Sequence, residues 1–167
     1  MRHLFMGTLM LALSSTSVAG GYAAADLVMS HIKPTATTGS GDVGALQFRI
    51  GTTLNSNGTV GGEFRAALGI GSDTDNGARY EMNRYFGAYL RAQFPNSMPL
   101  RPYGMLGVTR AETTINSSRE RFNDISLGIG AEYTLTQDMF LAVEYLRAVD
   151  RSKAEISNIG IGLGARF

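Results

Sequence analysis

The chain has 167 residues, of which 44% are hydrophobic and 17% are charged, and it contains no cysteine. The lack of cysteine excludes a disulfide framework and thiolate metal sites, and a formal net charge of +1 gives no electrostatic indication of nucleic-acid binding. The length is sufficient for one domain.

The first 19 residues have the pattern of a secretory signal peptide. Arg2 gives a basic start, an apolar run covers 4–13, and the small residues Ser17 and Ala19 precede the expected cut. We expect cleavage after Ala19, with a cut after Ala25 as the alternative. An apolar run of about ten residues is too short to cross a membrane as a helix. Residues 20–167 then form the mature domain.

Beyond this segment, apolar residues recur at every second position, which is the period of a β-strand. The predicted strands cover 22–33, 42–54, 59–71, 79–94, 100–114, 122–135, 139–149 and 154–167. For 22–33 and 100–114 the alternation is too irregular to show which face is apolar. No segment of the mature chain has a helical pattern.

The two faces of the predicted strands differ in chemistry. One face carries Ile, Leu, Phe and Val; the last strand alternates Ile159, Ile161 and Leu163 with glycines and ends on Phe167. The other face carries glycine and tyrosine interleaved with charged residues: Arg49, Glu63, Arg65, Arg91, Glu132 and Glu144.

The segments between the strands alternate in length. Short turns are predicted at 55–58, 95–99 and 136–138, since these contain Asn, Pro, Ser and Asp. Loops are predicted at 35–41, 72–78, 116–122 and 150–153. An even number of strands places both termini on the side of the short turns.

Two folds fit this alternation. A soluble β-sandwich would bury the apolar face, whereas a transmembrane barrel turns its apolar face to lipid and its polar face to the lumen. The signal peptide and the terminal Phe167 favour the barrel, whose closure pairs every backbone polar group. We therefore predict an all-β fold, an eight-stranded antiparallel up-and-down transmembrane β-barrel.

Three stretches carry a resemblance to a known family: "GIGLGARF", "SLGIGAEYTLTQDMFLAVEYL" and "RYFGAYLRAQFP". Over about 22–167 the chain resembles the small eight-stranded outer-membrane barrels of the OmpA/OmpX kind, which include Ail-like surface proteins. The resemblance implies a bacterial outer-membrane location, with loops facing outward. It also implies that the barrel-assembly machinery recognises the last strand, with Ile161, Leu163 and Phe167 as the assembly signal.

The lumen of so small a barrel should be filled by side chains. We therefore expect the charged residues of the inner face to form a paired network, because buried charges are costly unless they are paired. A hairpin register that pairs Thr53 with Thr59 would place Arg49 opposite Glu63. An ion path through the lumen is the alternative.

Catalysis has weak support in the sequence. Some small outer-membrane barrels modify lipid A with a His, a Ser and an acidic residue. His31, Ser72 and Asp73 supply these types, but their spacing does not indicate a triad. We expect no enzymatic activity, no cofactor and no metal ion.

The sequence thus predicts a monomeric, non-enzymatic outer-membrane barrel that displays short loops for envelope structure or adhesion. A lipid-A-modifying enzyme and a narrow channel are the alternatives. The expected partners are outer-membrane lipid and lipopolysaccharide, the barrel-assembly machinery, and a host or surface ligand, with no nucleic acid. The candidate surface loop contains Arg119, Glu120, Arg121 and Phe122, whose arginines suit lipopolysaccharide phosphates or an anionic host glycan. A merely solvated loop tip fits these charges equally well.

Overall fold

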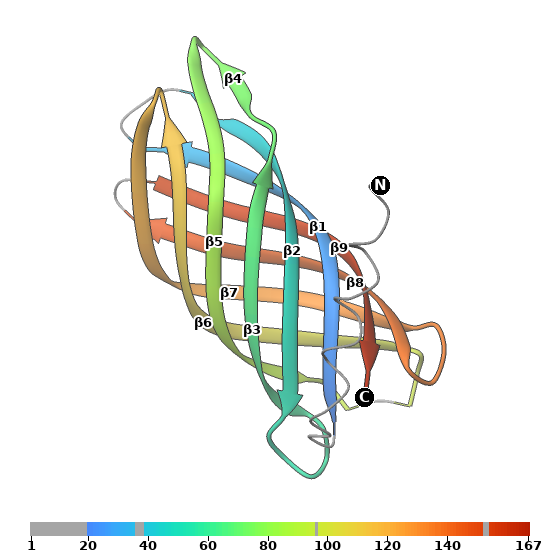
Figure 1. Cartoon of the computed structure of the whole chain (residues 1–167). Coiled ribbons are helices and arrows are strands. Elements are labelled where there is room, and N and C mark those ends of the chain that lie inside the picture. The colour runs from blue at the N-terminus through green and yellow to red at the C-terminus, as the bar shows by residue number, and fades with distance from the viewer. Residues whose placement is uncertain (1–19, 36–38, 96, 152–153) are drawn as a thin grey trace, which may run out of the picture.

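A computed structural model of the chain describes residues 20–35, 39–95, 97–151 and 154–167 (Figure 1). The predicted signal peptide lies outside these residues. The strands are β1 (Gly21–Pro34), β2 (Gly41–Thr53), β3 (Val60–Ile70), β4 (Asp73–Asp75), β5 (Ala78–Gln93), β6 (Leu100–Ile115), β7 (Ser118–Thr134), β8 (Met139–Arg151) and β9 (Ala154–Arg166). Among the described residues, no helix is long and apolar enough to cross a membrane.

All nine strands belong to one antiparallel sheet, and eight of them close into a barrel. The order is β3-β2-β1-β9-β8-β7-β6-β5-β4, and β3 also pairs with β5, which closes the sheet (Figure 1). The short β4 pairs with β5 alone beyond the barrel wall. The predicted eight-stranded barrel is confirmed, and β4 arises within the segment 72–78 that we predicted as a loop.

The outer surface of the barrel is apolar. Side chains of the predicted apolar face point outward, and Ile129, for example, is 67% exposed. The structure also shows which face points outward on the two strands for which the sequence did not: Leu27 on β1 and Leu106 on β6 are exposed, whereas Asp26 and Tyr103 are buried. Near the short turns the exposed side chains include three aromatic residues, Phe94, Tyr133 and Phe167. This distribution is typical of the lipid-facing band of a membrane barrel.

The prediction of a loop over 116–122 is wrong. Residues Arg119–Phe122 belong to β7, which pairs with β6 up to Ser118. The connection is only the pair Asn116 and Ser117, both with positive φ (49° and 69°), as a tight hairpin turn requires. The dense charges of this segment suggested a loop, but they lie on strands that continue beyond the apolar band.

The predicted register between β2 and β3 is also wrong. Thr53 pairs with Gly61, so Arg49 lies opposite Arg65 rather than opposite Glu63. The turn is wider than predicted because the Asn55 side-chain oxygen accepts hydrogen bonds from the backbone N–H groups of Thr59 (2.9 Å) and Val60 (3.0 Å). The shift of two residues keeps every side chain on its predicted face.

The inside of the barrel has two layers. The half near the short turns holds the charged residues, and the opposite half holds an apolar cluster that was not predicted: Val28, Ile32, Val43, Tyr80, Met82, Phe122, Leu146 and Ile156, among others. Glycines provide room for large side chains between the layers. At Gly130, for example, an added Cβ would lie 2.5 Å from the Tyr103 ring. The apolar cluster therefore occupies the interior at the end opposite the short turns.

Candidate functional site

Arg65 lies at the centre of the charged layer. The structure places all six predicted lumenal residues inside the barrel, each buried. The Nη2 atom of Arg65 donates to Oε2 of Glu144 at 2.7 Å, and Nε donates to Glu63 on the same strand. Glu144 also accepts a hydrogen bond from the Tyr103 hydroxyl at 2.8 Å. Arg65 thus joins β3 to β8 across the barrel interior.

A second group of charges lies nearer the short turns. Glu132 pairs with Arg91 and with Arg166, each at an N···O distance of 2.7 Å. The Arg91 guanidinium lies over the Tyr103 ring, 3.8 Å from its centroid, in cation–π geometry. Tyr103 therefore connects the two groups of charges.

Several members of the network were missed in the sequence. Asp26 pairs with Arg49 at 2.9 Å, and Arg166 pairs with Glu132. Asp26 was missed because the facing of its strand could not be assigned. The signal that could have placed Asp26 inside is the apolar pair Leu27 and Met29, which lie on the opposite face of the strand because residues two apart share a face.

The charged layer consists of paired side chains of opposite sign, with Arg101 beside them near the short turns. Its ion pairs involve the guanidiniums of Arg49, Arg65, Arg91 and Arg166 and the carboxylates of Asp26, Glu63, Glu132 and Glu144. The hollow between Arg49 and Glu144 has a volume of only about 10 Å³, at the lower limit for one water molecule. This geometry suits a structural plug.

The candidate surface residues are divided by the alternation of β7. Arg119, Glu120 and Arg121 are exposed, whereas Phe122 is buried in the apolar layer of the interior. Arg121 does not lie on a free loop: its Nε donates to Oε1 of Glu112 on β6 at 2.8 Å. The structure therefore does not keep the four residues together as one recognition loop.

Glu112 joins two arginines on the outside of the barrel. Its other carboxylate oxygen accepts a hydrogen bond from Nε of Arg84 on β5 at 3.0 Å. The Glu112 side chain is 7% exposed, while those of Arg84 and Arg121 are 48% and 55% exposed. Glu112 lies beyond the apolar band, and the hydrogen bond from Arg84, followed by that from Arg121, lowers the pKa of its carboxyl group. Sequence reasoning missed this cluster because its members come from three strands.

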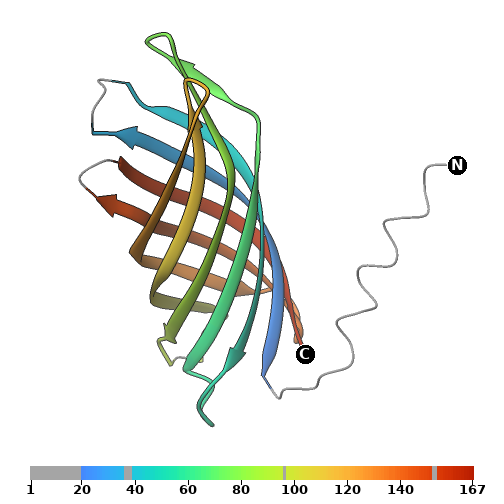
Figure 2. The same cartoon turned by 60° about the vertical axis from the view of Figure 1, so that its left-hand side comes forward.

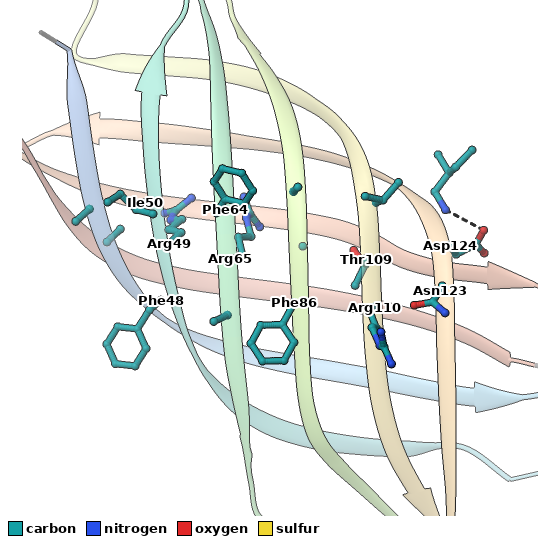
Figure 3. Close-up of a pocket in the computed structure, with 17 residues that line it drawn as sticks. Phe48, Arg49, Ile50, Phe64, Arg65, Phe86, Thr109, Arg110, Asn123 and Asp124 are labelled. Atoms are coloured by element: carbon teal, nitrogen blue, oxygen red, sulfur yellow. Dashed lines mark hydrogen bonds between the residues drawn. The ribbon is translucent and has the colours of Figure 1, made fainter. Parts of the chain in front are cut away.

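A hollow of about 1030 Å³ lies in the wall formed by β1, β2, β3, β5, β6 and β7. Exposed apolar residues such as Phe48, Phe64 and Phe86 line it, and Arg110, Asn123 and Asp124 lie at its margin (Figure 3). Phe86 pairs with Arg110, and Arg110 pairs with Asn123, so the apolar and polar parts share one row of the sheet.

The residues considered for catalysis do not form the expected combination. His31 Nδ1 lies 2.8 Å from Oδ1 of Asp42, whereas Asp73 accepts a hydrogen bond from the backbone N–H of Asp42 at 2.9 Å. Ser72 is exposed beside Asp73. Within the described part of the chain, no three His, Cys, Asp or Glu side chains are grouped as metal ligands would be.

The sequence matches the family described as "Outer membrane protein beta-barrel domain" over residues 4–167. The chain belongs to this family. The resemblance to small outer-membrane barrels that the sequence indicated is thereby confirmed. Among curated proteins, none is significantly similar in sequence to this chain.

Solved structures of outer-membrane barrels share the fold. Neisserial surface protein A (NspA) superposes with a TM-score of 0.65 at 18% identity, covering 89% of this chain and 98% of NspA. Ail of Yersinia pestis, in complex with a heparin analogue, superposes with a TM-score of 0.59 at 14% identity, covering 89% of this chain and 99% of Ail. The N-terminal barrel of Pseudomonas aeruginosa OprF superposes with a TM-score of 0.58 at 19% identity, covering 86% of this chain and 97% of the OprF barrel. At these identities the likeness concerns the fold alone.

Proposed function

We propose that this outer-membrane barrel is a non-enzymatic protein that displays a β-sheet extension at the bacterial surface for adhesion. The extension is formed by β4 and by the ends of β5, β6 and β7 that continue beyond the apolar band (Figures 1 and 2). The observation that carries the proposal is this difference between the two ends of the barrel. Short turns close one end, while the other projects paired strands above a plugged lumen.

An anionic glycan is the partner class that the extension suits. Arg79 on β5 is 64% exposed, and Arg119 on β7 is exposed near the neighbouring hairpin turn. The two strands flank β6, whose Ile115 pairs with Tyr80 on one side and Ser118 on the other. The similar barrel Ail was crystallised with the heparin analogue sucrose octasulfate. Arginines bind sulfate and carboxylate groups through paired N–H donors, so sulfated or carboxylated sugars are the expected ligands.

The test uses the double variant Arg79→Ser/Arg119→Ser on the cell surface. Binding of these cells to immobilised heparin should fall several-fold. The remaining binding should depend little on salt concentration, because the arginine–anion contacts that salt screens are removed in the variant. Arg147→Ser, an arginine of similar exposure on β8, is the matched control and should bind like the wild type. Unchanged binding by the double variant at equal surface level would refute the glycan assignment.

A lipid-A-modifying hydrolase is the second candidate. The observation in its favour is a row of three residues on adjacent strands: Asp42 on β2, His31 on β1 and Ser157 on β9. His31 lies between the other two residues in this row, and its Nδ1 contacts Asp42, as in a Ser-His-Asp arrangement. Between the described His31 and Ser157 side chains there is no hydrogen bond, so adhesion remains the first proposal. Mass spectrometry of lipid A from cells producing wild type or Ser157→Ala would decide: a modification lost in the variant supports the hydrolase.

A further inference from the structure

The outward arginines of β5, β6 and β7 occupy the border where the apolar band ends. In one row of the sheet Phe86 pairs with Arg110, which pairs with Asn123. In the next row Arg84 pairs with Glu112, which pairs with Arg121. Below these rows the outward residues are apolar, including Val108 and Ile125, which are 58% and 67% exposed. We call Arg84, Arg110 and Arg121 the border arginines.

The border arginines carry more positive charge than their neighbours neutralise. Glu112 supplies one carboxylate, and it accepts from Nε of Arg84 and Nε of Arg121. These bonds fix the two guanidiniums but do not use their terminal Nη donors. Among the described residues, no side chain forms an ion pair or hydrogen bond with the exposed Arg110 guanidinium. Asp124 also lines the hollow beside Arg110, so the cluster presents three cations near two carboxylates.

The wall formed by β8, β9, β1 and β2 has a different arrangement of charges. There Arg147 lies 4.0 Å from Glu155, and His31 lies 2.8 Å from Asp42. Each of these groups has an acidic partner of its own. Lys33 is also exposed on that wall and is the register partner of Glu155. The β5–β7 sector is therefore distinguished by three arginines on three adjacent strands in two neighbouring rows.

The apolar hollow opens beside this sector. It has a volume of about 1030 Å³ and reaches Arg110 (Figure 3). Its floor includes the small residues Ala66 and Ala88, which pair with Phe86 and Phe64 across β3 and β5. An alternation of alanine and phenylalanine on a lipid-facing wall leaves space between the rings for acyl chains. A ligand that contacts the border arginines and also occupies the apolar hollow must be an amphiphile with an anionic head group.

We propose that the border arginines and the hollow together bind a phosphorylated glycolipid of the outer leaflet, with its phosphate on Arg84, Arg110 and Arg121 and an acyl chain in the hollow. A guanidinium donates two parallel hydrogen bonds to phosphate oxygens, and Glu112 holds two of the three guanidiniums in place. The binding site lies on the barrel wall, not on the surface extension. It shares with the proposed function only the orientation of the extended end toward the cell exterior.

The experiment uses the whole mature barrel folded in neutral-detergent micelles, with binding measured by native mass spectrometry. The probes are diphosphoryl lipid A, the same lipid after enzymatic removal of its phosphates, and inorganic phosphate. Diphosphoryl lipid A should bind the wild type at least about tenfold more tightly than the dephosphorylated lipid, as expected for charged hydrogen bonds. Inorganic phosphate should bind far more weakly, since it cannot use the hollow.

Two variants separate the parts of the site. Arg84→Gln/Arg110→Gln should lower affinity for diphosphoryl lipid A about tenfold or more and leave affinity for the dephosphorylated lipid unchanged. Ala66→Phe, which fills the hollow from the lipid side, should weaken binding of both lipids. Arg147→Gln on the opposite wall is the matched control and should bind like the wild type. The folded fraction of each protein is read from its mobility on unheated gels.

Three outcomes would overturn the proposal. Equal affinity of the wild type for lipid with and without phosphate would remove the role of the border arginines. An equal loss in Arg147→Gln would show that any outward arginine suffices. Phosphate alone binding as tightly as diphosphoryl lipid A would show an anion site that does not recognise a lipid. Cell adhesion to heparin is a separate readout, so it can fail or persist without affecting this result.

Discussion

Replacing Glu144 by Gln should destabilise the barrel more than any other single charge change in the lumen. The carboxylate of Glu144 accepts from Arg65 and Tyr103 and lies 3.6 Å from Nη1 of Arg49. Gln keeps the shape but removes the negative charge, so the two arginines share only Asp26 and Glu63. Removing one partner of a buried ion pair costs about 3–5 kcal/mol of unfolding free energy. That loss is a large fraction of the roughly 5–15 kcal/mol that holds a typical domain folded.

A double-mutant cycle tests whether the loss comes from unbalanced charge. Arg65→Met removes the cation that Glu144 holds, and the double variant Glu144→Gln/Arg65→Met restores neutrality. We expect the double variant to be more stable than the sum of the single effects by about 1–3 kcal/mol. Unfolding is followed in urea by circular dichroism, since the chain contains no tryptophan. The control is Glu155→Gln, whose exposed pair should contribute at most about 1 kcal/mol.

Two results would refute this reasoning. A Glu144→Gln barrel as stable as the wild type would mean that water screens the layer. Strictly additive effects in the cycle would mean that Glu144 and Arg65 do not depend on each other, despite the 2.7 Å contact between them.

Three further predictions concern the wall, the C-terminus and the packing of the lumen. Ile161→Arg should destabilise the barrel in lipid by about 2–4 kcal/mol. Ser157→Arg, on the same outward face but near the edge of the apolar band, should cost only about 0–1 kcal/mol. Equal losses of unfolding free energy in urea titrations would contradict the assignment of Ile161 to the lipid-facing side. Deletion of Phe167, whose N–H donates to Gly21 at 2.9 Å, should lower the amount of folded protein in outer-membrane fractions without lowering its export. The control is Tyr133→Ala, at an aromatic residue that is 48% exposed, against 47% for Phe167; unchanged levels after the deletion would argue against an assembly signal. Gly130→Val should cost about 1–3 kcal/mol because it forces a methyl group against the Tyr103 ring; a wild-type melting curve would show that the ring can move aside.

The sequence was sufficient for the features that depend on alternation alone. Ile125, Leu127 and Ile129 on β7 face outward as predicted, because a period of two fixes the face of every residue once one face is known to meet lipid. Alternation does not fix how far one strand is shifted along the next. The Arg49–Arg65 register therefore depended on the Asn55 turn, whose side-chain hydrogen bonds the sequence does not specify.

The arginine cluster needed the three-dimensional structure for a different reason. Arg84, Glu112 and Arg121 are adjacent only because two hairpins bring β5, β6 and β7 together in a particular register. In the sequence, Arg121 stood among charges typical of a loop, whereas its strand continues through them. Charge density indicates exposure to water, but it does not distinguish a loop from a strand that extends out of the membrane.

The length of the surface extension sets how far the protein reaches from the cell. Strand β5 continues six residues beyond Arg84 to Ala78, and at about 3.3 Å per residue this is at most roughly 20 Å above the hydrocarbon border. Sugars of neighbouring lipid molecules that are longer than this would stand taller than the hairpins and obstruct large partners. Short oligosaccharides would still diffuse to the arginines. Adhesion through this protein should therefore depend on how long the surface polysaccharide is, and cells that shorten it would uncover the hairpins without making any more of the protein.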